Sequence, residues 1–387
     1  MVDMDSIFHY CRGFSHIATD KPCQDCAYAE SVGSLSMAIV SDGHGGDRYF
    51  RSDVGSKLLV EITAEAIRQF SELGGGYGGL HILTSEDNSE SNIGYDVVNH
   101  KLRWLFSSII AQWNTAIEKH FEEHPLTEWE LSHIEDKYRS EFLKAQSHEK
   151  TYGCTLMAFF RTSTYWIAFQ IGDGKLLTLN MVGEEPVFNQ PVPWDEKCFL
   201  NKTTSICDSN ALDEFRYCYC SDKSFPAAVF LGSDGLDDTY GDGELLENFY
   251  MNVLLEIARG KEKAQKTLES DLPEISKRGS KDDMSVAVVY DDTDIVSVAI
   301  QIVNNQMERN VRKREEIEDK INRLKSKIEN CETAPLSESE RIEMEYAKKD
   351  LAKAETALAN AQVQWSRLCG KKGFYQRLAN NLKNGNE

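Results

Sequence analysis

The sequence predicts an α+β protein in which strand-like runs alternate with long amphipathic helices, followed by a separate helical segment. Three β-rich apolar runs, 35–46, 164–175 and 227–238, each end in Asp-Gly, a pair typical of turns at strand ends. A fourth run, 280–290, has two aspartates directly before its strand. Strand ends and strand starts meet at one edge of an antiparallel sheet, so these acids are expected to converge there.

Four aspartates directly before or after predicted strands are the first candidate functional residues: Asp42, Asp173, Asp234 and Asp282. A single Asp-Gly pair is most often an ordinary turn. Four carboxylates at one rim, however, repel one another unless a cation lies between them. The sequence therefore predicts a site for a hard metal cation at one edge of the sheet.

Amphipathic patterns between the strand-like runs predict helices. The expected helices have apolar residues spaced by three and four positions and cover 52–70, 95–121 and 126–145. The Gly- and Ser-rich stretch 73–92 predicts a loop. Residues 153–174 predict a hairpin of two strands, and 182–226 are expected to be irregular.

The character of the chain changes near residue 295, and we expect a body of residues 1–295 and a second domain of residues 296–387. Pro335 stops one helix, and Ser337 forms a capping box with Glu340 at the start of the next. The second helix has small residues at heptad spacing, namely Ala347, Ala354 and Ala361. This pattern predicts an antiparallel, coiled-coil-like helical hairpin. The hairpin either braces the body or binds a partner protein or a second copy.

Charge and composition narrow the function. The net charge is −20, and it is uneven, because residues 304–387 carry +3 and residues 1–303 carry −23. An acidic body repels phosphates of DNA and RNA, which argues against nucleic-acid binding. No run reaches the roughly 18 apolar residues of a membrane helix, and the N-terminus has no signal-peptide pattern. The ten scattered cysteines are typical of reduced thiols, so we expect a cytoplasmic protein without a membrane partner.

Five short blocks, in this order, resemble the metal-dependent Ser/Thr protein phosphatases of type 2C. The blocks are SDGHGG (41–46), GCTLMAFF (153–160), IGDGK (171–175), GSDGLDD (232–238) and SKDDMSVAVV (280–289). The resemblance covers roughly residues 8–291. It implies a four-layer α-β-β-α sandwich of two antiparallel sheets flanked by helices. It also implies a hydrolase that acts on phosphoserine and phosphothreonine in a phosphoprotein substrate.

The same resemblance implies two Mg²⁺ or Mn²⁺ ions, and a weaker third ion, at the edge where the aspartates meet. The implied ligands are Asp42 as the bridge between two ions, the Gly43 carbonyl, Asp234, Asp282 and, for the third ion, Asp173. Two such ions lower the pKa of a shared water, and the resulting hydroxide attacks phosphorus in line. His44 is the implied general acid, which protonates the departing alkoxide.

The stretch DKPCQDC, which begins at Asp20, departs from the family pattern. Asp20 stands where the family has its phosphate-binding Arg, and Gln24 stands where the family has Glu, while Asp25 matches the final acid. Gln24 retains an amide oxygen that accepts hydrogen bonds from metal-bound water, but it brings no charge. The missing Arg removes a bidentate phosphate clamp, and Lys21 and Arg12 are the candidate replacements.

Two other functions stay open from the sequence. The first is a catalytically weak relative that binds a phosphoprotein while its helices act as a scaffold, which the departures at Asp20 and Gln24 favour. The second is a Mg²⁺-dependent helical adaptor without hydrolytic activity. The intact acids Asp42, Asp234 and Asp282 favour the enzyme, because a binding module has no need of a complete ligand set.

Overall fold

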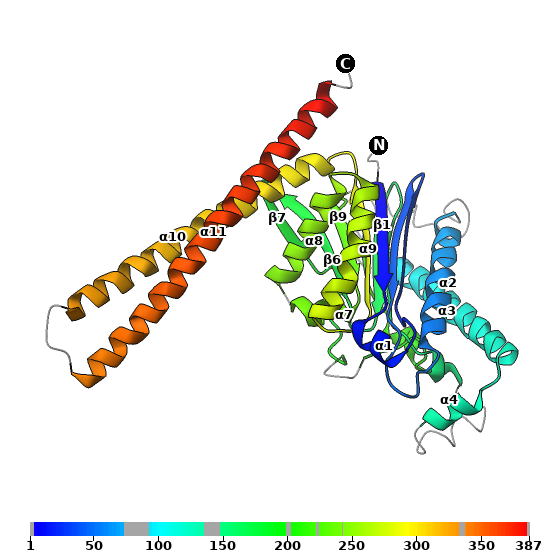
Figure 1. Cartoon of the computed structure of the whole chain (residues 1–387). Coiled ribbons are helices and arrows are strands. Elements are labelled where there is room, and N and C mark those ends of the chain that lie inside the picture. Colours follow the sequence, from blue (N-terminus) through cyan, green and yellow to red (C-terminus); the bar gives the residue numbers. More distant parts are fainter. Residues whose placement is uncertain are drawn as a thin grey trace. The chain divides into compact units, whose positions relative to one another are not determined.

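The computed structural model describes residues 4–72, 93–134, 148–198, 203–221, 224–241, 243–332 and 337–384. The chain divides into two compact units. One contains Met1–Asn180 and Val187–Ile295, and the other contains Met181–Pro186 and Val296–Glu387. The first unit is an α+β sandwich, and the second consists mainly of two long helices (Figure 1).

Two five-stranded antiparallel sheets form the centre of the sandwich (Figure 1). Sheet A has the strand order β1 (Met4–Cys11), β10 (Met284–Asp291), β9 (Ala228–Gly232), β6 (Lys175–Val182) and β7 (Glu185–Asn189). Sheet B has the order β2 (Cys26–Val32), β3 (Leu35–Ser41), β4 (Leu156–Arg161), β5 (Trp166–Ile171) and β8 (Arg216–Cys220). This architecture confirms the predicted fold class, and β4 and β5 confirm the predicted hairpin.

Alternating side chains of the strands fill two hydrophobic layers at once. On β3, Ala38 and Val40 lie in the core between the sheets, where they share a cluster with Val289 of β10. Met37 and Ile39 of the same strand lie in the other cluster, against the helices. The strand is therefore apolar on both faces, which explains its continuous hydrophobic run.

Helices cover the outer faces of both sheets. The helices α2 (Ser52–Glu72) and α3 (Ile93–Glu123) cover sheet B, and α8 (Glu244–Ile257) and α9 (Lys261–Arg278) cover sheet A (Figure 1). The buried indole of Trp113 on α3 donates to the Gly55 carbonyl of α2 at 3.0 Å. The short helices are α1 (Phe14–Thr19), α4 (Glu128–His133), the 3₁₀-helix η4 (His148–Tyr152), α6 (Ala211–Glu214) and α7 (Asp234–Tyr240).

One prediction is wrong and two fall partly or wholly outside the described residues. The segment 182–226 is not irregular throughout, because it contains β7, α6 and β8. On β8, Tyr217 and Tyr219 pack toward the helices, whereas Cys218 and Cys220 pack toward the other sheet. The expected helix over 126–145 is described as α4 only, since residues 135–147 lie outside the described residues, as does the predicted loop over 73–92.

The second unit contains the predicted helical hairpin, built from α10 (Ile295–Glu332) and α11 (Glu338–Asn384). The predicted capping box is present, because Ser337 N donates to Glu340 at 2.8 Å and Glu340 N donates to the Ser337 hydroxyl at 3.4 Å. An ion pair of 3.2 Å between Lys327 and Glu343 joins the two helices near their connection. The buried seam of α11 repeats every seven residues: Ala347, Ala354, Ala361, Leu368 and Tyr375.

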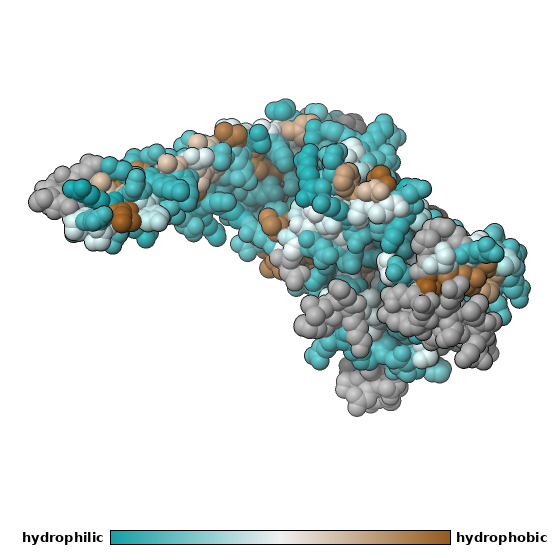
Figure 2. Space-filling model, turned by 60° about the horizontal axis from the view of Figure 1, so that its bottom comes forward, coloured by the Kyte–Doolittle hydropathy of each residue, from teal (hydrophilic) through white to brown (hydrophobic). Residues whose placement is uncertain are grey.

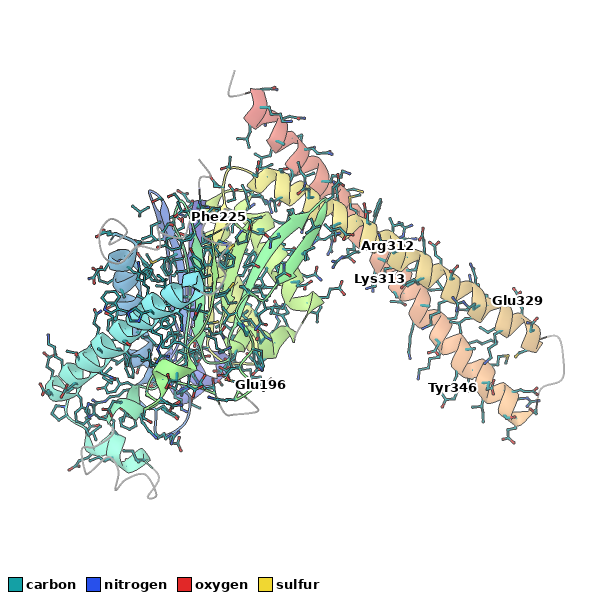
Figure 3. All side chains as sticks on the ribbon, turned by 180° about the vertical axis from the view of Figure 1, so that it is seen from behind. Glu196, Phe225, Arg312, Lys313, Glu329 and Tyr346 are labelled. Carbon is teal, nitrogen blue, oxygen red and sulfur yellow. The ribbon has the colours of Figure 1, made fainter. Side chains whose placement is uncertain are left out.

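Asn310 is a buried polar residue in this seam, with only 4% of its surface exposed. Its amide donates to the Ala361 carbonyl at 3.2 Å, and this bond exists in one alignment of the two helices. A single buried Asn therefore fixes their register at some cost in stability. Arg312 and Lys313 on α10 are exposed, as is Tyr346 on α11 (Figure 3).

The described surface is mainly hydrophilic on the face shown in Figure 2. Apolar residues are scattered over it singly or in small groups, as is normal for water-exposed surfaces. Among the described helices, none has both the length and the apolar character needed to cross a membrane.

Replacing Gly55 with Ala is expected to lower the free energy of unfolding of the sandwich by about 1–3 kcal/mol. A Cβ at this position would lie 1.9 Å from the Tyr152 carbonyl oxygen, so α2 must move away from η4. Urea unfolding followed by tryptophan fluorescence measures the change. The control is Gly370→Ala on α11, where nothing lies within 4 Å of the added Cβ. An unchanged midpoint for Gly55→Ala would contradict the close packing.

Candidate active site

The four predicted aspartates lie at one edge of the sandwich, because strands of both sheets begin or end there. Asp42 follows β3, Asp173 follows β5, Asp234 follows β9, and Asp282 shortly precedes β10. Two hydrogen bonds fix the backbone of Asp42: Thr155 N donates to its carbonyl at 2.8 Å, and its own N–H donates to the Thr155 hydroxyl at 3.1 Å. The sandwich thus brings together acids that are distant in sequence.

The pKa values show that these carboxyl groups act on one another. Burial, followed by the charges of Asp234 and Asp25, raises the pKa of Asp42 well above its ordinary value. Burial also raises the pKa of Asp234 to about 6; a hydrogen bond with Asp42 opposes this shift, and the charges of Asp173 and Asp282 add to it. Burial likewise raises the pKa of Asp173. A divalent cation between these groups would relieve the repulsion.

Two further oxygens at this edge have no hydrogen-bond partner among the described residues: Asp25 Oδ2 and Gln24 Oε1. Only 1% of Asp25 and 6% of Gln24 is exposed. Burial, then the charge of Asp283, raises the pKa of Asp25 well above its ordinary value. The amide nitrogen of Gln24 donates to the His44 carbonyl at 3.1 Å, so the amide oxygen is left for another donor. Unsatisfied buried oxygens fit a hydrated hard cation.

The donor set suits Mg²⁺ or Mn²⁺, because carboxylate, carbonyl and amide oxygens are the ligands that these ions prefer. Within the part of the chain that the structure describes, no group of three or more His, Cys, Asp or Glu side chains is arranged to hold a metal ion.

The loop from Asp42 to His44 packs tightly against its neighbours. A Cβ on Gly43 would lie 2.6 Å from the Gln24 carbonyl oxygen, so a larger residue is excluded here. The His44 N–H donates to the Gly153 carbonyl at 3.1 Å. This packing holds the Gly43 backbone beside the aspartates.

His44 lies at the same edge, and its ring meets the Tyr49 ring edge-on with centroids 4.7 Å apart. Burial, followed by the charge of Arg48, lowers the pKa of His44 to about 4. The imidazole is therefore neutral near pH 7 before a substrate binds. Because a phosphoryl dianion beside the ring would raise this pKa, the implied role as general acid depends on bound substrate and stays a prediction.

Of the candidate replacements for the family arginine, Arg12 is held by other groups, and Lys21 lies close to His16. The Arg12 guanidinium donates to Asp20 Oδ1 at 3.2 Å and to the His16 carbonyl at 3.0 Å. The charge of Lys21 acts on His16, and its backbone N–H donates to the His16 carbonyl at 3.0 Å. Arg12 is thus held by the very residue that stands in place of the family arginine.

Sequence reasoning missed Asp283, whose carboxylate contacts three residues from the segment between β1 and β2. Its carboxylate, 3% exposed, accepts from the N–H groups of Gly13 at 2.5 Å and Gln24 at 2.6 Å and lies 2.9 Å from His16 Nδ1. The contact with Asp283 raises the pKa of His16. Although burial opposes it, these interactions lower the pKa of Asp283. Asp283 is a tether, while the neighbouring Asp282 is half-exposed at the site.

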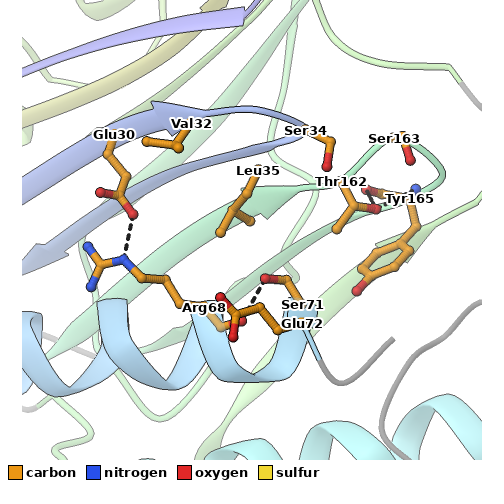
Figure 4. A pocket seen from close by; sticks show the side chains of 10 residues that line it. All are labelled: Glu30, Val32, Ser34, Leu35, Arg68, Ser71, Glu72, Thr162, Ser163 and Tyr165. Atoms are coloured by element: carbon orange, nitrogen blue, oxygen red, sulfur yellow. Dashed lines mark hydrogen bonds and ion pairs between the residues drawn. The ribbon is translucent and has the colours of Figure 1, made fainter. Parts of the chain in front are cut away.

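A separate pocket of about 430 Å³ lies where β2 ends and β3 begins, away from the end of β3 that leads to Asp42 (Figure 4). Its lining includes Val32 at the end of β2, Leu35 at the start of β3, and Arg68 of α2, which forms an ion pair of 2.7 Å with Glu30. Because Asp42 follows the other end of β3, this pocket is distinct from the acidic edge.

A sandwich of two antiparallel sheets with aspartates at their common edge agrees with the phosphatase resemblance of the sequence. The sequence match identifies the group: the family described as protein phosphatase 2C matches residues 12–272, which is more than half of the chain. The chain belongs to this family.

Among solved structures, PppA of Pseudomonas aeruginosa, a regulatory component of T6SS, is 16% identical, with coverage of 74% of this chain and 97% of that chain and a TM-score of 0.43. The serine/threonine phosphatase PstP/Ppp of Mycobacterium tuberculosis is 14% identical, with coverage of 75% and 99% and a TM-score of 0.41. The serine/threonine phosphatase of S. agalactiae is 17% identical, with coverage of 74% and 99% and a TM-score of 0.38. No curated protein sequence matches the chain.

Replacing His16 with Gln is expected to cost about 1–2 kcal/mol of the free energy of unfolding at pH 6 and less at pH 8.5. Contact with Asp283 raises the pKa of His16, so the stability from its charged form is complete below about pH 6.5 and is lost as the pH rises through the raised value. Urea unfolding of both proteins at the two pH values measures the difference. A difference that is larger at pH 8.5 would contradict the ion pair.

Proposed function

We propose that the protein hydrolyses phosphoserine and phosphothreonine in proteins with the help of Mg²⁺ or Mn²⁺. The observation that supports this proposal is the convergence of Asp42, Asp173, Asp234 and Asp282 on one edge of a protein phosphatase 2C chain, with mutual charge effects on their pKa values. Such a cluster is costly for the fold, since buried carboxylates repel one another. A cation site that needs these charges accounts for the cost.

The proposed ligands contribute oxygen atoms: Asp42, the Gly43 carbonyl, Asp234, Asp282, Asp173 for a third ion, and Asp25 with Gln24, directly or through water. When bound, two such ions supply an activated water and neutralise the phosphoryl oxygens. Because the pKa of Asp234 is raised to about 6, its carboxylate gains full charge only above that pH. Metal affinity is therefore expected to rise with pH through this range.

His44 contributes a proton to the leaving group in this proposal. The neutral ring lies beside Tyr49 before substrate arrives, and the negative charge of the phosphoryl group favours its protonation. The alkoxide of serine or threonine is a poor leaving group, so a nearby acid speeds its departure.

A phosphatase that is weak or inactive is the second candidate, and the uncharged Gln24 favours it. Gln24 supplies an amide oxygen where the family has a carboxylate, which weakens attraction for a cation. Such a protein would bind a phosphoprotein without hydrolysing it, with the helical hairpin contacting a partner or a second copy.

Replacing Asp234 with Asn is expected to lower Mn²⁺-dependent release of phosphate from a phosphothreonine peptide by at least about 100-fold, since it removes a metal-binding charge. A malachite-green assay measures the released phosphate, and a chelator is expected to abolish release by the wild type. Asp213→Asn is the matched control, because Asp213 is exposed and pairs with Arg103 at 2.9 Å.

If folded wild-type protein shows no turnover with either metal, the weakly active alternative replaces the enzyme. Asp20→Arg with Gln24→Glu is then the variant in which activity is expected to appear.

Replacing His44 with Asn is expected to lower kcat on a phosphothreonine peptide by about 100-fold or more. The same change is expected to have a much smaller effect on p-nitrophenyl phosphate, because p-nitrophenolate leaves without a proton. Steady-state kinetics of both substrates measure the ratio. Equal losses on both would show that His44 does not act as the acid.

A further inference from the structure

A phosphoryl dianion that enters this site must approach an edge lined with negative groups. The described carboxyl groups whose charges act at this edge include those of Asp25, Asp42, Asp173, Asp234, Asp238 and Asp282. Bound ions offset part of this charge, and the family uses an arginine to hold the phosphoryl oxygens. Here Asp20 occupies that position, so another cation is needed if the proposed function holds.

The nearby cations include Arg12, Lys21 and Arg216, in addition to Arg48. Arg12 donates to Asp20 and to the His16 carbonyl. Arg216 donates to the carbonyls of Gly172 and Pro193.

Arg48 lies on the loop that directly follows the Asp42–His44 stretch. Its guanidinium carbon lies 4.6 Å from the centroid of the Tyr49 ring, and its Nη2 donates to the Tyr49 hydroxyl. The Tyr49 ring in turn lies edge-on against His44, with centroids 4.7 Å apart. Arg48, Tyr49 and His44 therefore form a continuous row at the acidic edge, and the charge of Arg48 acts on His44.

The position of Tyr49 is fixed by its surroundings. A Cβ on Gly153 would lie 2.9 Å from the Tyr49 ring, so the glycine makes room for the ring. The Tyr49 N–H donates to the Gly46 carbonyl at 2.8 Å, and the Ser52 N–H donates to the Tyr49 carbonyl at 2.9 Å. A ring held in this way is a platform that orients the Arg48 guanidinium above it.

We propose that Arg48 is the phosphate-binding cation of this site and takes over the task of the missing family arginine, with Tyr49 as its positioning residue. This proposal rests on the proposed function for its biological role. Its physical core, the binding of an inorganic phosphate or phosphomonoester group by Arg48, can be tested without turnover.

The geometry suits the task. A guanidinium over an aromatic ring keeps its charge, and the forked arrangement of its donors matches two oxygens of a phosphoryl group.

The experiment compares Arg48→Ala, Arg48→Lys and Arg12→Ala with the wild type, using inorganic phosphate as the probe. Calorimetric titration in the presence of Mg²⁺ gives the affinity, and product inhibition of p-nitrophenyl phosphate hydrolysis gives an independent value. Arg48→Ala is expected to weaken phosphate binding about 10- to 100-fold and to raise KM more than it lowers kcat. The phosphate affinity of Arg48→Lys is expected to lie between those of the wild type and Arg48→Ala. Lysine keeps the positive charge but lacks the planar guanidinium that binds two oxygens at once.

Arg103→Ala is the matched control, since it removes an exposed positive charge that pairs with Asp213. A larger effect of Arg12→Ala than of Arg48→Ala would overturn the proposal and assign the clamp to Arg12. Unchanged phosphate affinity in Arg48→Ala, or no phosphate binding by the wild type, would also overturn it. Should Arg48→Ala not fold, as judged by circular dichroism, Arg48→Lys and Arg48→Gln provide the same comparison.

Phosphate binding without turnover by the wild type separates the two proposals. In that case the proposed hydrolysis fails, while the effect of Arg48→Ala on the calorimetric affinity still decides the role of Arg48.

Discussion

The repulsion between buried carboxyl groups at one edge of the sandwich is the constraint on which the site depends. Asp42 and Asp234 share a hydrogen bond, and burial together with neighbouring charges raises both pKa values. Without a counterion, the repulsion would favour separation of these carboxyl groups and entry of water between them. Hydrogen bonds resist this separation. Thr155, directly before β4, accepts from the Asp42 N–H, and the Asp283 carboxylate accepts from the Gln24 N–H in the segment before β2. A cation bound at this edge would relieve the repulsion.

Close backbone packing supplies much of this resistance. A side chain on Gly43 would collide with the Gln24 carbonyl, and one on Gly55 would collide with the Tyr152 carbonyl. Helix α2 therefore lies directly against η4, which leads into the Gly153 carbonyl that accepts from His44. The outer helical layer and the acidic edge are joined by these backbone contacts and by the side chains of Gln24 and Ser52, which both donate to the His44 carbonyl. Backbone contacts of this kind leave little rotational freedom at the site.

Local periodicity and turn pairs at strand ends predicted the helical hairpin and the convergence of the aspartates, and the resemblance to a known family implied the sandwich of two sheets. The sequence did not predict β8, since the alternating Tyr and Cys residues of this strand gave no long apolar run. The roles of Asp283 and Arg12 were also hidden, because both depend on contacts between distant segments. The neutral state of His44 depends on burial, which no spacing of residues reveals.

The two departures from the family pattern differ in their electrostatic consequences. Asp20 adds a negative charge, but its side chain is fully exposed and lies 3.2 Å from Arg12, so water and that cation screen it from the acidic edge. Gln24 is buried and removes a negative charge close to Asp25, which lessens repulsion at the edge as well as attraction for a cation. Neither change removes one of the four aspartates before or after the strands. Asp20 therefore alters how the site holds a phosphoryl group, whereas Gln24 alters how strongly it attracts a cation.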